Sequence, residues 1–390
     1  MMQVGRRALL GAAAAAPILG AGRRARAAAE PLRLGAVLSV TGANSFNGDP
    51  EDKTLRQYVE MINGQGGVDG RRIELTIYDD SADAAKTNTF TRRLIQQDKV
   101  SVILGPSLTG PTLGIIPLVE ASHVPTLSYG GGSAIIDPVR PYVFKVVQTD
   151  RLGALKIMGE LKERGIKTIG LMADTGGYGK TARPVMMGVA KENGIAIGAD
   201  ETFGYNDTDM TPQLTHARQA GVEALVILSS TEVPATIARN CHQLGMTIPL
   251  YVTAGQATFE FVKAAGAVGN GIRLPTSAVL VADQLPESKP ERKPALAYIK
   301  AFEDRWKMKA STFGGFAYDS LMLALDAVKR TGSTDPVKLR DAIEQTKDFV
   351  GVTGIFNMSP TDHAGLGLES YSMAEIRDGR FVLAPPPKAG

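Results

Sequence analysis

Residues 100–110 have the sequence VSVILGPSLTG, an apolar run that ends in a loop of glycine, proline and hydroxyl residues. The run 100–104 is too short for a helix, and its length and apolar character favour a strand with both faces buried. A helical pattern at 110–122 and a second apolar strand at 124–128 follow. The stretch therefore predicts one β–α–β unit of a parallel sheet with helices on its faces.

The same alternation of strands and helices extends outward over most of the chain. Further strands are predicted at 32–39, 72–78, 168–173, 195–203, 224–229 and 250–254. Further helices are predicted at 52–63, 84–97, 153–164, 179–193, 211–220, 233–244, 295–306, 316–331 and 336–345. We therefore expect an α/β protein with two doubly wound parallel-sheet lobes, and a length of 390 residues suits two domains.

The first 29 residues are expected to be an export signal rather than part of the fold. Arg6 and Arg7 precede an apolar run at 8–21, and small residues at 25–29 suit a cleavage site. The adjacent arginines favour the twin-arginine export route slightly over general secretion. The segment predicts that the mature protein is periplasmic.

Loss of this segment changes the charge of the protein. It contains five of the 43 basic residues and no acidic ones, which leaves 38 basic against 40 acidic residues and moves the net charge from +3 to −2. Such a balance argues against nucleic acid as a partner. No later apolar run is long enough to span a bilayer.

Five loops follow predicted strands at the edge where open parallel sheets bind their ligands. They lie at 41–48, 105–110, 128–133, 174–181 and 229–231. The first three are rich in glycine and hydroxyl residues, which allow backbone N–H groups to approach a ligand closely, and helix starts favour anions. These loops predict a site for a carboxylate or a phosphate.

One of these loops lies within residues 173–181, ADTGGYGKT, which end like a phosphate-binding loop. The strict pattern needs glycine where Asp174 stands, so a nucleotide-dependent enzyme is the less favoured alternative. The nucleophile-elbow pattern fails at Thr109, and the four histidines lack metal-ligand spacing. We expect no catalytic residue, cofactor or metal, and we expect Cys241 to be a small buried residue.

Residues 63–75, NGQGGVDGRRIEL, with Asp79 and Asp80 after them, resemble the signature of the periplasmic leucine/isoleucine/valine-binding protein family. The resemblance continues through Gly105-Pro106, 125–128, Asp174 with Tyr178-Gly179, 316–319 and 351–354. It implies a type I periplasmic binding protein, whose two lobes are joined by a three-crossover hinge and close on a small ligand. With crossovers near Val147, near Ser277 and near the final strands, lobe 1 would comprise 31–147 plus about 277–350, and lobe 2 would comprise 148–276 plus about 351–390.

The resemblance also implies site residues. In this family the first lobe holds the ligand carboxylate, here through Thr109 after one strand and Gly130, Gly131 and Ser133 after the next. Tyr178 would cover the ligand from the second lobe. The family's usual threonine near Gly132 is missing. Further candidates are Phe46, Asn47, Ser128 and Ser230 on the same set of loops, and Gln256 after a later strand.

A second departure concerns the ligand ammonium group. Amino-acid binders of the family hold it with an acidic residue after a strand of the second lobe, but the corresponding stretch 252–257, VTAGQA, has none. Burying an unpaired ammonium costs several kcal/mol. Either Asp174 or Glu232 replaces the missing acid, or the ligand is an aromatic or other carboxylic acid without an ammonium. The sequence leaves both open.

We predict that the protein is not an enzyme but the monomeric substrate-binding component of an ABC importer. It would deliver a small carboxylate ligand to a membrane permease with cytoplasmic ATPase subunits. A ligand sensor that controls a different partner is the alternative on the same fold.

Overall fold

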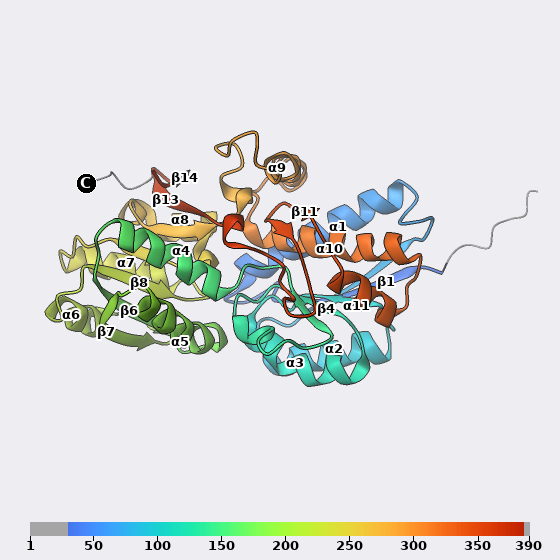
Figure 1. Ribbon diagram of the computed structural model, residues 1–390, viewed down its shortest axis with the longest axis horizontal. Helices are drawn as coiled ribbons and strands as arrows, with labels where there is room; N and C mark the ends of the chain where they lie inside the picture. The colour runs from blue at the N-terminus through green and yellow to red at the C-terminus, as the bar shows by residue number, and fades with distance from the viewer. Residues whose placement is uncertain (1–29, 386–390) are drawn as a thin grey trace, which may run out of the picture.

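The computed structural model describes residues 30–385, so the expected export signal at 1–29 and the last five residues lie outside the described part. The described chain forms two α/β lobes side by side (Figure 1). Each lobe contains one main sheet with helices on both faces, which confirms the predicted fold class.

The first sheet is entirely parallel. Its strands, in spatial order, are β2 (Ile73–Asp79), β1 (Leu32–Leu38), β3 (Val102–Leu104), β4 (Thr126–Ser128) and β5 (Val143–Lys145). Alternate residues of a strand point to opposite faces. Val37 and Ile103 therefore pack with α2 (Ala84–Gln96) and α3 (Thr109–Ser122), whereas Leu34 and Leu104 pack on the face covered by α1 (Ser45–Gly64) and α10 (Thr312–Thr331).

The second sheet has seven strands. In spatial order they are β14 (Arg380–Leu383), β13 (Ser372–Arg377), β10 (Arg273–Thr276), β9 (Leu250–Val252), β8 (Ala224–Leu228), β6 (Thr168–Asp174) and β7 (Ala196–Phe203). Val226 packs with α4 (Asp150–Glu163) and α5 (Gly177–Glu192), whereas Leu225 and Ile227 pack with α6 (Thr211–Gln219), α7 (Val233–Gln243) and α8 (Phe259–Ala265).

The remaining elements connect or cover the lobes. They are α9 (Arg292–Trp306), α11 (Pro336–Glu344), and a short hairpin of β11 (Phe349–Val350) and β12 (Ile355–Phe356). The chain leaves the first sheet after β5 and enters the second lobe at α4. It returns between β10 and α10, and it crosses again between β12 and β13.

Three local features differ from the sequence prediction. Helix α1 begins at Ser45 and not at residue 52. Pro50 lies inside the helix near its N-terminus and does not interrupt it. Strand β5, of only three residues, was not predicted. The last two strands, β13 and β14, pair antiparallel at the edge of an otherwise parallel sheet.

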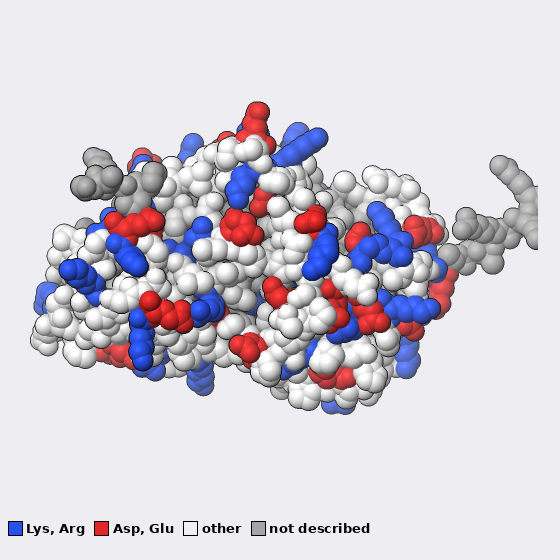
Figure 2. Space-filling model, viewed as in Figure 1, with Lys and Arg blue, Asp and Glu red and all other residues white. Residues whose placement is uncertain are grey.

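The surface carries mixed charge. Figure 2 shows basic and acidic side chains interspersed on the face that it displays. Of the helices between residues 30 and 385, none is long and apolar enough to cross a membrane.

Candidate ligand-binding site

A cavity of about 670 Å³, including its open mouth, lies between the two lobes. Both lobes and the first crossover contribute to its wall, as expected for a site beyond the carboxyl ends of parallel strands. The residues used below are Asn47, Ser107, Thr109, Tyr129, Gly131, Gln148, Asp150, Tyr178, Ser229, Ser230, Phe313, Phe316 and Tyr371.

The wall formed by the first lobe offers hydrogen-bond donors. Thr109 begins α3, and its hydroxyl oxygen accepts the Gly132 N–H at 3.1 Å, so the hydroxyl hydrogen remains available to a ligand. The Gly131 N–H donates to no other described residue. Together with the start of α3, whose first N–H groups have no partner within the helix, these groups suit an anion.

Lys145 fixes the glycine loop from behind. Its ammonium donates to the carbonyl oxygens of Gly131 at 2.7 Å and Gly132 at 3.0 Å, and the Asp150 N–H also donates to Gly131 at 3.0 Å. Burial lowers the pKa of Lys145 to about 8, although the charge of Asp150 opposes this shift. The carbonyl oxygens of the loop are therefore occupied on the side away from the ligand.

Asp150 has the single charged side chain among the described residues that line the cavity. Its Oδ1 accepts the N–H groups of Ser133 and Arg151, at 3.1 and 2.8 Å. Its Oδ2 is buried and has no partner in the described chain. Burial raises the pKa of Asp150 above its usual value, and the nearby Lys145 opposes that shift. The free oxygen is suited to a cationic donor.

Gln148 adds a second unpaired acceptor on the same crossover. Its amide nitrogen donates to the Thr353 carbonyl oxygen at 2.8 Å, which defines the orientation of the side chain. Its Oε1 is buried without a partner between residues 30 and 385. The crossover thus contains two buried acceptor oxygens without a partner in the described chain, one of them on a carboxyl group.

The second lobe closes the cavity through direct contacts with the first. The ring of Tyr178 lies over Gly131, where an added Cβ would be 3.0 Å from Tyr178 Cε2. The Asn44 amide donates to the Ser230 carbonyl oxygen at 2.9 Å across the cleft. These contacts describe a closed arrangement of the lobes.

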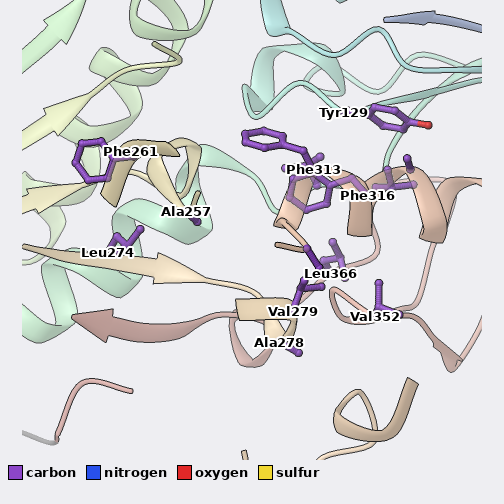
Figure 3. Packing of buried hydrophobic residues seen from close by; sticks show 14 of the residues in the cluster. Tyr129, Ala257, Phe261, Leu274, Ala278, Val279, Phe313, Phe316, Val352 and Leu366 are labelled. Atoms are coloured by element: carbon purple, nitrogen blue, oxygen red, sulfur yellow. The ribbon is translucent and has the colours of Figure 1, made fainter. Parts of the chain in front are cut away.

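Aromatic side chains form the apolar part of the wall. Phe313 and Phe316 project from α10 in the cluster shown in Figure 3, with ring centroids 5.9 Å apart. Tyr129 and Tyr371 also line the cavity, and the Tyr129 hydroxyl is paired with Ser320 at 2.7 Å. The cavity wall thus combines hydrogen-bonding groups with aromatic rings.

Five of the sequence-predicted binding residues line this cavity: Asn47, Thr109, Gly131, Tyr178 and Ser230. The other five, Phe46, Ser128, Gly130, Ser133 and Gln256, lie behind it or beside it. Phe46 contacts Phe313 edge-on, the Ser128 hydroxyl bonds to Thr112, and the Gly130 N–H donates to Ser128. Ser133 donates its N–H to Asp150. The Gln256 amide donates to the carbonyl oxygens of Ser229 and Thr231, and its oxygen accepts the Thr253 hydroxyl. These five hold the lining residues in position.

The two acidic residues considered for the ligand ammonium, Asp174 and Glu232, are not among the residues that line the cavity. Asp174 is 2% exposed, and its carboxylate accepts N–H groups from Gly176, Gly179 and Ser230. Both of its oxygens are therefore used to hold the turn before α5. Glu232 is exposed at the start of α7.

The segment that resembles a phosphate-binding loop forms an ordinary strand-to-helix turn. Lys180 is exposed on α5, as expected from the sequence, and the Thr181 hydroxyl donates to backbone carbonyls of its own helix. Within residues 30–385, no group of three or more histidine, cysteine or acidic side chains is placed to hold a metal ion.

Asp150 and Gln148 were missed by the sequence interpretation. Asp150 follows Thr149, whose side chain caps α4, so it resembles the acidic residue found in the first turn of many helices. The available signal was its position, three residues after the predicted crossover at Val147, because crossovers in a two-lobed protein border the cleft.

Comparisons with known proteins show the family and the fold of the chain. A family model for periplasmic binding proteins matches residues 31–380. A leucine-, isoleucine-, valine-, threonine- and alanine-binding protein from Pseudomonas aeruginosa is 22% identical over 326 residues, covering 81% of this chain and 83% of the relative.

Two solved structures are similar over nearly their whole length. An extracellular ligand-binding receptor from Rhodopseudomonas palustris HaA2 has a TM-score of 0.85 at 25% identity, covering 91% of this chain and 99% of its own. The branched-chain amino acid transporter substrate-binding protein LivJ from Streptococcus pneumoniae, in complex with isoleucine, has a TM-score of 0.80 at 25% identity, covering 90% and 97%.

Proposed function

The chain belongs to the periplasmic binding protein family, among the leucine/isoleucine/valine-binding proteins, and from that premise we propose that it captures a small amino acid for an ABC importer. It is a solute-binding protein without catalytic activity. It acts in the periplasm after export, as a monomer, and its closed form delivers the ligand to a membrane permease with cytoplasmic ATPase subunits.

The observation that carries this proposal is the distribution of charge and hydrogen-bond donors in the cavity. Thr109 and Gly131 offer donors for a carboxylate at the start of α3. Asp150 offers a free carboxylate oxygen, and Gln148 a free amide oxygen, for an ammonium. A zwitterion satisfies both sets at once, whereas an acid without an ammonium leaves the Asp150 oxygen unpaired, at a cost of about 1–3 kcal/mol or more.

Asp150 supports an amino acid over an acid without an ammonium, the two ligand classes left open by the sequence. The carboxylate of Asp150 would repel a carboxylate ligand, unless the ligand carries its own positive charge. The P. aeruginosa relative is named for binding five amino acids, and the S. pneumoniae protein was solved with isoleucine, which supports the same class.

Closure of the lobes couples ligand capture to delivery. A ligand that contacts Thr109 on one lobe and Tyr178 on the other stabilises the closed arrangement relative to the open one. Its affinity is expected near the micromolar range, about −8 kcal/mol.

A thermal-shift screen tests the proposal. The panel contains L-leucine, L-isoleucine, L-valine, L-threonine, L-alanine and L-glutamine, together with benzoate and phenylacetate. At least one amino acid should raise the unfolding midpoint of the wild-type protein by mass action. Thr109→Ala and Tyr178→Ala should each weaken the response while leaving the ligand-free midpoint within a few degrees of wild type. Unchanged responses in both variants would show that the ligand binds elsewhere.

A further inference from the structure

The amide of Asn47 is one of the polar groups of the cavity that neither the carboxylate nor the ammonium of the ligand accounts for. Asn47 lies in the first turn of α1, is 2% exposed and lines the cavity. Its Oδ1 has no hydrogen-bond partner in the described chain. An unpaired buried polar atom costs about 1–3 kcal/mol, so such an atom in a binding cavity points to a group on the ligand.

The hydroxyls of two other lining residues, Ser107 and Tyr129, already have partners elsewhere in the protein. The Ser107 hydroxyl accepts the Ser39 N–H at 3.1 Å and donates to Glu51, and the Tyr129 hydroxyl is paired with Ser320 at 2.7 Å. Neither of these two hydroxyls is therefore free to donate to Asn47.

The other side-chain amides near the site have defined protein partners. Asn44, three residues earlier, donates across the cleft to Ser230 at 2.9 Å, and Gln256 is bonded at both ends. Gln148 lies on the crossover beside Asp150, where the ligand ammonium is assigned. Asn47 comes from α1, a different element from the loops that carry Thr109, Gly131 and Asp150.

We propose that the side chain of the ligand carries a neutral hydroxyl or amide group that hydrogen bonds to Asn47. This inference rests on the proposed function and narrows the ligand to polar, uncharged amino acids such as threonine or glutamine. An amide offers both donors and an acceptor, so a hydroxyl or amide complements it in either orientation.

The absence of a second ionic partner excludes a charged side chain. Apart from Asp150, no charged residue of the described chain lines the cavity. Glu51, one turn after Asn47 on α1, is completely buried and is not among the lining residues, and burial raises its pKa. A buried ammonium or carboxylate at Asn47 would therefore be unbalanced.

Calorimetric titration with isosteric ligand pairs tests this inference. L-threonine and L-valine differ by a hydroxyl in place of a methyl group, and L-glutamine is compared with L-methionine. We expect the wild-type protein to bind threonine or glutamine at least about tenfold more tightly than its apolar counterpart, because a site built to hydrogen bond rejects the analogue that cannot.

Two variants test whether Asn47 causes the preference for threonine or glutamine over their apolar counterparts. Asn47→Leu should reduce the preference to about twofold or reverse it, since the unpaired amide is gone. Its unfolding midpoint without ligand should match or exceed that of wild type. Asn44→Leu is the matched control, because it removes an amide already bonded to the second lobe. This variant should weaken the binding of all four ligands to the same extent, so that the threonine-to-valine and glutamine-to-methionine affinity ratios stay as in wild type.

The outcomes separate this inference from the proposed function. If valine and methionine bind the wild-type protein as tightly as threonine and glutamine, the inference is overturned while the proposed function stands. If Asn47→Leu keeps the wild-type preference, Asn47 is not the residue that sets it and the inference fails. If no amino acid of the larger panel binds, both fail together.

Discussion

Asp319 is a buried carboxylate that holds the last crossover in place. It is completely buried on α10, and it accepts the backbone N–H groups of Val352 at 2.7 Å and Thr353 at 2.9 Å. The Thr353 carbonyl oxygen in turn accepts the amide of Gln148 in the cavity wall. Through this chain of bonds, one residue of the first lobe fixes the loop against which the ligand site is built.

The pKa of Asp319 makes this contact dependent on pH. Burial raises it to about 7 from a usual value near 3.8, although the hydrogen bonds from Thr353 and Val352 oppose the shift. Because the folded pKa lies above the unfolded one, the stabilisation is fully present below about pH 4 and is lost as the pH rises through 7. The neighbouring Tyr298 and Tyr318 have pKa values raised above 10 by burial, so they do not titrate in this window.

We therefore predict that Asp319→Asn changes the pH dependence of folding. The stability difference between wild type and variant should decline between about pH 4 and pH 7, by up to about 1.4 kcal/mol per pH unit. Urea unfolding of both proteins at a series of pH values measures this difference. Parallel stability profiles would contradict the assigned role of Asp319.

At the scale of elements, the starts of α3 and α5 meet across the cleft at two glycines. A Cβ added to Gly177, the first residue of α5, would lie 2.6 Å from the Cα and 2.8 Å from the N of Gly110. A Cβ added to Gly110 would meet Gly177 only at 3.6 Å, an ordinary contact. The two positions thus differ sharply in the space that they leave for a methyl group.

This difference predicts the behaviour of two alanine variants. Gly177→Ala should obstruct closure and weaken the binding of every ligand by about tenfold or more, since the closed state carries the ligand contacts. Gly110→Ala should bind within about twofold of wild type. Small-angle X-ray scattering at saturating ligand should show a larger radius of gyration for Gly177→Ala. Equal affinities in the two variants would mean that these helix starts do not limit closure.

The elements also show how far the sequence could be interpreted. Alternating strand and helix patterns were sufficient for the two lobes, because buried parallel strands are short apolar runs with helices between them. The start of α1 was missed because Pro50 normally indicates a helix boundary. Strand β5 was missed because three residues are too few to show a strand pattern. The motif at 316–319 and the motif at 351–354 proved to be contact partners through Asp319.

The binding site was predictable only in part, for a physical reason. Thr109, Gly131 and Tyr178 occur in distinctive loops after strands, and all three line the cavity. Whether a carboxylate is free depends on its hydrogen bonds, which sequence patterns do not contain. Asp174 was a plausible candidate until its three backbone bonds were known, and Asp150 resembled a common helix-start residue.

The whole molecule is built to bring two unlike surfaces together around one ligand. The first lobe supplies donors at Thr109 and Gly131, the crossover supplies the charge of Asp150, and the second lobe adds the ring of Tyr178. Because the contacts come from both lobes, the ligand can shift the balance between open and closed forms. This dependence on both lobes is the physical basis of the proposed role in transport.

The central claim is that the cavity binds a zwitterion whose ammonium is held by Asp150. Calorimetric titration of the six amino acids, benzoate and phenylacetate into wild type and Asp150→Asn tests it most directly. We predict that an amino acid binds the wild-type protein near the micromolar range, that both acids give no binding heat, and that Asp150→Asn weakens the amino acid about 100-fold or more, roughly 3 kcal/mol. Tighter binding of benzoate or phenylacetate than of any amino acid, with affinity kept or increased in Asp150→Asn, would contradict the account.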